Sequence, residues 1–315
     1  MPQRASSSAI LLAFAAIYII WGTTFLGIAL VLRSLPPFFG GSLRFMTASL
    51  LMYLWLRWRD PHPFAGLSIP GVVLCGVLMT GMGNGFVIYA QTGLPSGVAA
   101  LFIAILPVLT LVLDWAFYAH RRPAMGAVVG VTVGFAGILV LTVNMHSLSG
   151  AIRPIHVAAV IVAELAWANA TLLQRRYVPI GRVASFTCLQ MFIGSLFQLL
   201  MGLINHEWTQ LDPSRFTLSS LLALLYLIVF GSLVAFNCFS FLVARVAPQK
   251  ITTYALVNPV IAVALGALVL GEKVTPAALL AAALVLLGVA LVLFPGVVER
   301  RGPGAGTAVA ELENR

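Results

Sequence analysis

Charged side chains are scarce in this sequence. They account for 9% of its 315 residues, whereas hydrophobic side chains account for 61%, and the mean hydropathy is +1.03. So little polar surface cannot cover a soluble globule of this length. The composition therefore excludes a soluble globular protein and predicts a chain that has the lipid bilayer as its solvent.

Cysteines and enzymatic motifs are scarce as well. The three cysteines, Cys75, Cys188 and Cys238, are odd in number and fall within apolar stretches, so they predict no disulfide framework. HExxH, GxSxG and nucleotide-binding loops are absent, as are paired carboxylates at helical spacing. We therefore expect no enzyme, no catalytic residue, no cofactor and no metal site, and no pump that is driven by ATP.

Long apolar segments dominate instead. A transmembrane helix needs roughly 20 predominantly apolar residues, because in lipid every backbone amide must be satisfied within the helix. Ten segments meet this requirement: 9–32, 38–56, 69–89, 96–117, 124–143, 155–173, 183–204, 218–244, 251–270 and 277–294. The sequence predicts an all-α membrane protein with ten transmembrane helices and no soluble domain between them.

The basic residues predict how these helices are oriented. With the N-terminus in the cytoplasm, thirteen arginines and lysines lie on that side and four lie outside, namely Arg33, Arg153, Arg215 and Lys273. We expect a bacterial inner membrane protein with both termini cytoplasmic, and residues 296–315 as a disordered cytoplasmic tail. The net charge of +9 is interpreted as this topological signal, so no nucleic acid and no required protein partner are expected.

The chain contains an internal repeat. Residues 84–107 resemble residues 237–259, and Asn84 and Asn237 lie 153 residues apart; Trp21 and Trp167 lie 146 apart. Ten spans divide into halves of five, 1–145 and 151–295, and an odd number per half inverts the second half. Inverted repeats are typical of secondary transporters, which hold a small-molecule substrate near the middle of the bilayer.

Side chains that are unusual at membrane depth mark the expected substrate site. Glu164 and Arg44 are charges within spans, which are costly and commonly functional. Glu164 either faces a cavity, where it receives an ammonium group or carries a proton, or pairs with another polar group. Arg44 either faces the cavity or extends toward the interface. Trp21 and Trp167 lie near span centres, where an indole either packs as core or lines a cavity.

The amides allow two interpretations as well. Asn84 and Asn237 either hydrogen-bond between helices or contact a ligand. Gln190 lies 146 residues after Arg44, at the matching place in the second half. The expected substrate-binding residues are Trp21, Arg44, Asn84, Glu164, Trp167, Gln190, Asn237 and Tyr254.

Several stretches resemble the EamA family of the drug/metabolite transporter superfamily. They are WGTTFLGI from Trp21, PPFFGGSLRF from Pro36, and YALVNPVIAVALGALVLGEKVT from Tyr254. The first half departs from the family pattern where residues 118–121 read YAHR instead of a GE pair. The resemblance implies ten spans, cytoplasmic termini and export of small metabolites, with amino-acid exporters among the members. We expect an exporter of small amphiphilic metabolites, amino acids above all; the alternatives are an exporter of cationic drugs and a passive channel.

The predicted topology can be tested with reporter fusions. A reporter fused after Pro295 should be cytoplasmic, and one inserted near Asp212 should be external, because the basic residues require it. Finding both reporters on the same side of the membrane would rule out the ten-span topology.

Overall fold

The computed structural model describes residues 6–94, 99, 102–120, 122–144, 153–261 and 276–294, and every element in these ranges is a helix. The first half contains α1 (Ser7–Val31), α2 (Pro37–Arg59), α3 (Ile69–Cys75), α4 (Gly85–Ala90), α6 (Leu106–Leu113) and α7 (Met125–Asn144). The second half contains α8 (Pro154–Tyr177), α9 (Val183–Ile204), α10 (Leu218–Tyr226), α11 (Ala235–Val243), α12 (Pro248–Ile251) and α14 (Pro276–Leu293).

The helices have the lengths and composition of membrane spans. Five helical segments are long and apolar enough to cross a bilayer: Ser7–Val31, Ile69–Ala90, Pro154–Tyr177, Ile180–Ile204 and Leu218–Val243. Shorter apolar helices are Leu106–Tyr118, Met125–Val140 and Leu279–Leu293. The prediction of an all-α membrane protein is confirmed. The predicted spans 96–117 and 251–270 and the tail 296–315 lie partly or wholly outside the described residues.

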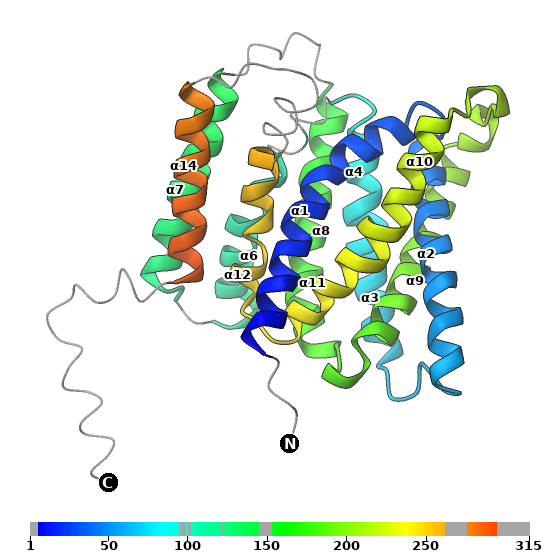
Figure 1. The fold of residues 1–315 in the computed structure, drawn as a ribbon, viewed down its shortest axis with the longest axis horizontal. Coiled ribbons are helices and arrows are strands. Elements are labelled where there is room, and N and C mark those ends of the chain that lie inside the picture. Colours follow the sequence, from blue (N-terminus) through cyan, green and yellow to red (C-terminus); the bar gives the residue numbers. More distant parts are fainter. Residues whose placement is uncertain are drawn as a thin grey trace, which may run out of the picture.

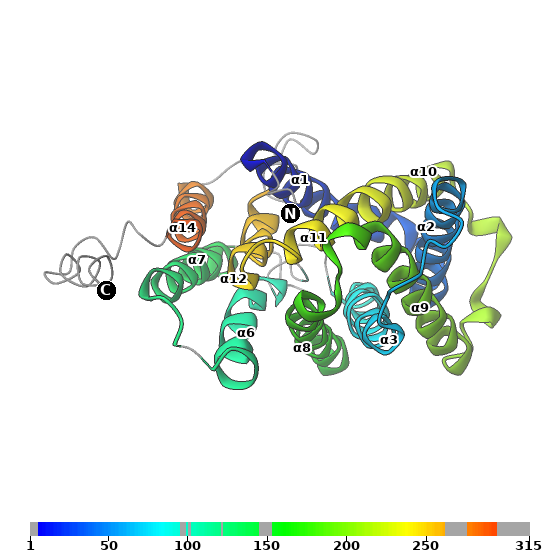
Figure 2. The ribbon, with the colours of Figure 1, turned by 90° about the horizontal axis from the view of Figure 1, so that it is seen from below.

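Helices of the first half pack on their counterparts in the second half. The pair α7 and α14 forms one end of the molecule, and the pair α2 and α9 packs together toward the other end (Figures 1 and 2). Between them, α1 packs along α10 and α11, while α8 packs along α3 and α4. This exchange of equivalent neighbours is what two halves related by a two-fold pseudo-axis would produce.

Small residues allow the closest of these contacts. A Cβ atom on Gly130 would lie 2.7 Å from the backbone oxygen of Gly288, and one on Gly288 would lie 2.5 Å from the nitrogen of Gly134. The backbones of α7 and α14 therefore touch, which only glycine permits at these positions.

Two spans widen into π-helix at matching places in the two halves. The matching π-helical stretches are Gly76–Asn84, between α3 and α4, and Leu227–Val234, between α10 and α11; a further one, Asp114–Tyr118, follows α6. A π-helical turn shifts the backbone hydrogen-bonding pattern and recurs at functional sites. The Gln198 amide donates to the oxygen of Thr80 in the first stretch at 2.7 Å. The sequence predicted plain α-helix in both segments.

A buried carboxylate ties the loop after α9 to the beginning of α2. Glu207 is 3% exposed, and its Oε2 and Oε1 accept hydrogen bonds from the backbone N–H groups of Phe39 at 2.8 Å and Phe38 at 3.2 Å. A helix N-terminus has free N–H groups that favour an anion. Burial raises the pKa of Glu207, and the two hydrogen bonds oppose that rise. One side chain from the second half thus caps a helix of the first half.

Removal of this cap should destabilise the protein. Glu207→Ala should lower the free energy of unfolding by about 1–2 kcal/mol, because two buried N–H groups lose their acceptor. The measurement is the melting temperature of the purified protein in detergent. Asp212→Ala is the control, because that partly exposed carboxylate bonds only within its own turn and its loss should lower the melting temperature less. Equal effects of the two substitutions would contradict the capping role of Glu207.

Candidate functional site

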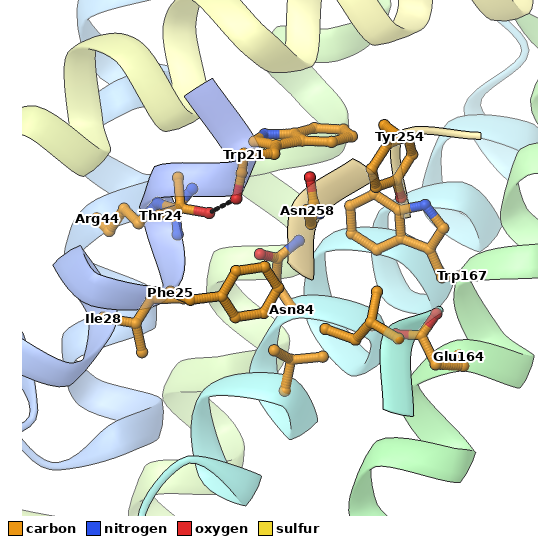
Figure 3. Close-up of a pocket in the computed structure, with 13 residues that line it drawn as sticks. Trp21, Thr24, Phe25, Ile28, Arg44, Asn84, Glu164, Trp167, Tyr254 and Asn258 are labelled. Carbon is orange, nitrogen blue, oxygen red and sulfur yellow. Dashed lines mark hydrogen bonds between the residues drawn. The ribbon is translucent and has the colours of Figure 1, made fainter. Parts of the chain in front are cut away.

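A cavity lies between the two halves. It contains about 480 Å³ of space free of protein atoms, part of it open to solvent, and water-sized spheres can enter about 60 Å³ of it. Figure 3 shows the side chains around it. The lining residues come from α1, α2, the first π-helical stretch, α4, α8 and the helical backbone at 254–261: Trp21, Thr24, Phe25, Ile28, Arg44, Gly83, Asn84, Val87, Ile103, Glu164, Trp167, Tyr254 and Asn258.

Aromatic rings close one end of this cavity. Trp21 and Trp167 meet edge to face with their ring centroids 5.5 Å apart, and Tyr254 lies 4.7 Å from Trp21. Phe236 and Phe239 of α11 contact both indoles. Such contacts are worth about 0.5–1.5 kcal/mol each beyond the area they bury. We call these five residues the aromatic cluster, and it lies toward the end of the cavity at which α1 begins.

Two charges of opposite sign line the cavity without pairing. Arg44 is 2% exposed and Glu164 is 3% exposed. The Arg44 Nε donates to the Ser232 hydroxyl at 2.9 Å, while its Nη1 and the Glu164 Oε2 have no hydrogen-bond partner among the described residues. The ion pairs among the described residues are Arg182 with Asp60 and Arg215 with Asp212. The cavity is therefore lined by one basic and one acidic side chain that form no ion pair among the described residues.

Two amides add further free hydrogen-bonding groups. The Asn84 Nδ2 and the Asn258 Oδ1 are buried and lack partners among the described residues, and both side chains line the cavity (Figure 3). The first is a donor and the second an acceptor, so the cavity offers both to a ligand. The described residues contain no group of three His, Cys, Asp or Glu side chains that could hold a metal ion.

Six of the eight residues predicted from the sequence line the cavity. They are Trp21, Arg44, Asn84, Glu164, Trp167 and Tyr254. The other two do not. The Gln190 Oε1 accepts a hydrogen bond from Gln174, and Asn237 donates to the Leu233 oxygen at 2.7 Å and faces the Met52 sulfur at 3.4 Å. Their amides are occupied by protein partners, which is the helix-to-helix role that was the alternative for Asn237.

Some lining residues carried no strong signal in the sequence. Thr24, Phe25 and Ile28 are ordinary residues of an apolar span. Asn258 was detectable, because it lies four residues after Tyr254 and so shares a helical face with it. It also precedes Pro259 in the repeated segment.

Membrane-spanning helices around a cavity lined by a few polar groups are the arrangement expected of a multi-pass membrane transporter. The chain belongs to the EamA-like transporter family, which matches residues 7–143 and 155–294. The family resemblance predicted from the sequence is confirmed.

Named relatives agree with this class. The chain is 33% identical over 292 residues to the inner membrane transporter YedA of Escherichia coli K12, with 90% of this chain and 92% of that protein covered. It is 24% identical over 303 residues to a "Probable amino-acid metabolite efflux pump" of Salmonella typhimurium, with 92% and 96% covered. The chain is accordingly a multi-pass inner membrane protein, and its family and relatives are transporters rather than enzymes.

A solved protein structure has the same fold. It covers 94% of this chain and 99% of its own, with a TM-score of 0.73 at 21% sequence identity.

The unpaired charge of Glu164 should weaken the fold rather than support it. A buried charge without a partner is unfavourable, and functional sites commonly carry such a cost. Glu164→Gln should therefore leave the melting temperature in detergent unchanged or raise it, in contrast to the loss expected for Glu207→Ala. A fall as large as that of Glu207→Ala would show that Glu164 is a structural residue.

Proposed function

We propose that this transporter exports small amphiphilic metabolites, above all amino acids and including aromatic ones. The observation that supports the proposal is the central cavity, which combines an aromatic cluster with buried polar groups that have no partner among the described residues. Apolar walls with a few convergent polar groups are the usual composition of a small-molecule site. The name of the Salmonella relative, an amino-acid metabolite efflux pump, supports the same substrate class and direction.

Alternating access is the proposed mechanism. The halves 1–145 and 151–295 would rock about the cavity, with both termini in the cytoplasm. The aromatic cluster would then be the cytoplasmic barrier, because it lies on the side where α1 begins. Residues of both halves form it, Trp21 from the first half, and Trp167 and Tyr254 from the second, so a relative movement of the halves would separate the rings and open this end.

An exporter of cationic drugs is the second candidate. Glu164 beside aromatic rings favours it, since carboxylates and indole faces both attract cations. Arg44 in the same cavity opposes it, because a cationic ligand would leave that charge unpaired. A passive channel is disfavoured because the sequence shows no rings of charge and no carbonyl-filter motif.

The aromatic cluster provides the test. In proteoliposomes, the wild-type protein should show saturable counterflow of phenylalanine, which a channel would not show. Trp21→Ala and Trp167→Ala should weaken apparent affinity several-fold for bulky solutes and less for alanine, because a lost ring contact is worth roughly 1 kcal/mol. Trp167→Phe, which keeps an aromatic ring, should lose less.

Trp58→Ala is the matched control for this test. Trp58 is 82% exposed near the end of α2, far from the cavity lining, so its loss should not change the preference among solutes. Equal losses for phenylalanine and alanine in the Trp21 and Trp167 variants would assign these indoles to packing alone.

A further inference from the structure

The two charges of the cavity occupy places where the matching half carries a neutral residue. Arg44 and Gln190 are equivalent, 146 residues apart, and the same spacing pairs Tyr18 with Glu164 and Trp21 with Trp167. The first half therefore supplies the cation and the second half supplies the anion. A scaffold with two similar halves has been made electrically asymmetric at its centre.

Similar hydrogen bonds at the two positions support their equivalence. The Arg44 Nε donates to the Ser232 hydroxyl at 2.9 Å, and the Gln190 Nε2 donates to the Thr80 hydroxyl at 3.5 Å. Ser232 and Thr80 are themselves 152 residues apart and lie in the two π-helical stretches. The same contact thus occurs once in each half.

Among the described residues, the neutral members of these pairs have hydrogen-bond partners, whereas each charged member keeps a buried polar atom without one. Gln190 also accepts a hydrogen bond from Gln174, and the Tyr18 hydroxyl bonds the Thr253 hydroxyl at 2.6 Å. In contrast, the Arg44 Nη1 and the Glu164 Oε2 have no partner among the described residues. Charges at membrane depth are expensive unless they are paired, so their partners are expected to come from a ligand.

The charges are also kept apart. Figure 3 shows Arg44 and Glu164 at opposite ends of the cavity, with Phe25 and Asn84 between them. A ligand with one charge would leave the other protein charge unpaired, at a cost similar to that of breaking a buried pair. A ligand with an anion at one end and a cation at the other would pair both.

We propose that the cavity selects zwitterions whose two charges are separated by an apolar body, with the carboxylate at Arg44 and the ammonium group at Glu164. Arginine suits the first role because its planar fork binds a carboxylate through two hydrogen bonds. The ring faces of Trp167 and Tyr254 lie beside Glu164 (Figure 3) and contact the apolar body. The inference rests on the proposed function and narrows the preferred substrates to amino acids whose amino and carboxyl groups lie at opposite ends of the molecule.

Three aromatic solutes of similar shape test the inference. They are 4-(aminomethyl)phenylacetate, with a charge at each end, and its single-charge analogues 4-methylbenzylamine and 4-methylphenylacetate. Dissociation constants would be measured by calorimetry on the purified protein. The zwitterion should bind about 30-fold or more tightly than either analogue, since an unpaired buried charge is costly. It should also bind more tightly than phenylalanine, whose two charges lie next to each other instead of at opposite ends of the molecule.

Substitutions assign the two ends. Glu164→Gln should abolish the preference for the zwitterion over 4-methylphenylacetate and keep that over 4-methylbenzylamine. Arg44→Gln, which installs the residue that the matching position carries, should do the reverse. Glu207→Gln and Arg245→Gln remove charges outside the cavity and should keep the wild-type ratios. If both cavity variants still prefer the zwitterion over both single-charge analogues, the inference is wrong.

Counterflow of phenylalanine separates this inference from the proposed function. If phenylalanine exchanges but the zwitterion binds no better than its single-charge analogues, or phenylalanine binds more tightly, only the inference fails. If none of these solutes exchanges across the membrane, the proposed function fails.

Discussion

The contact between Trp21 and Trp167 is the interaction on which the centre of this transporter depends. The two indoles lie 146 residues apart, at matching places in the sequence of the two halves, and meet edge to face. Tyr254, Phe236 and Phe239 pack around the pair. On one side of this contact the chain is packed with apolar side chains; on the other side lies the cavity with its unpaired polar groups. The position of this cluster thus determines where the cavity ends.

The sequence predicted most of the fold because lipid leaves the backbone few options. Apolar length alone located the helices, and Ser7–Val31 and Val183–Ile204 begin and end within a few residues of the predicted spans. The π-helical stretches were not predictable. The hydropathy of a segment does not change when its helix widens by about one residue per turn. In the first stretch, the Gln198 amide donates a hydrogen bond to the Thr80 oxygen, which is a tertiary contact that the sequence does not show. Glu207 escaped notice for the same reason, because its partners on α2 lie far away in the sequence.

Part of the candidate site was predictable, because charged side chains in the middle of a membrane span are commonly functional. Arg44 and Glu164 were conspicuous as charges within spans, and both line the cavity. Gln190 was selected because it matches Arg44, yet Gln174 occupies its amide. Sequence spacing gives the position of a side chain on the scaffold, but whether a protein group already satisfies it depends on neighbours that only the structure reveals. Because matching positions carry different residues, the cavity has a basic side chain at one end and an acidic side chain at the other (Figure 3).

The central claim is that the substrate lies in the cavity beside the aromatic cluster. The most direct test is a crystal structure with 4-iodophenylalanine, in which anomalous scattering locates the iodine atom independently of the protein phases. The account predicts a single strong peak among Trp21, Trp167 and Tyr254. A peak instead in the apolar groove that Leu50 and Phe192 line between α2 and α9, with an empty cavity, would contradict it.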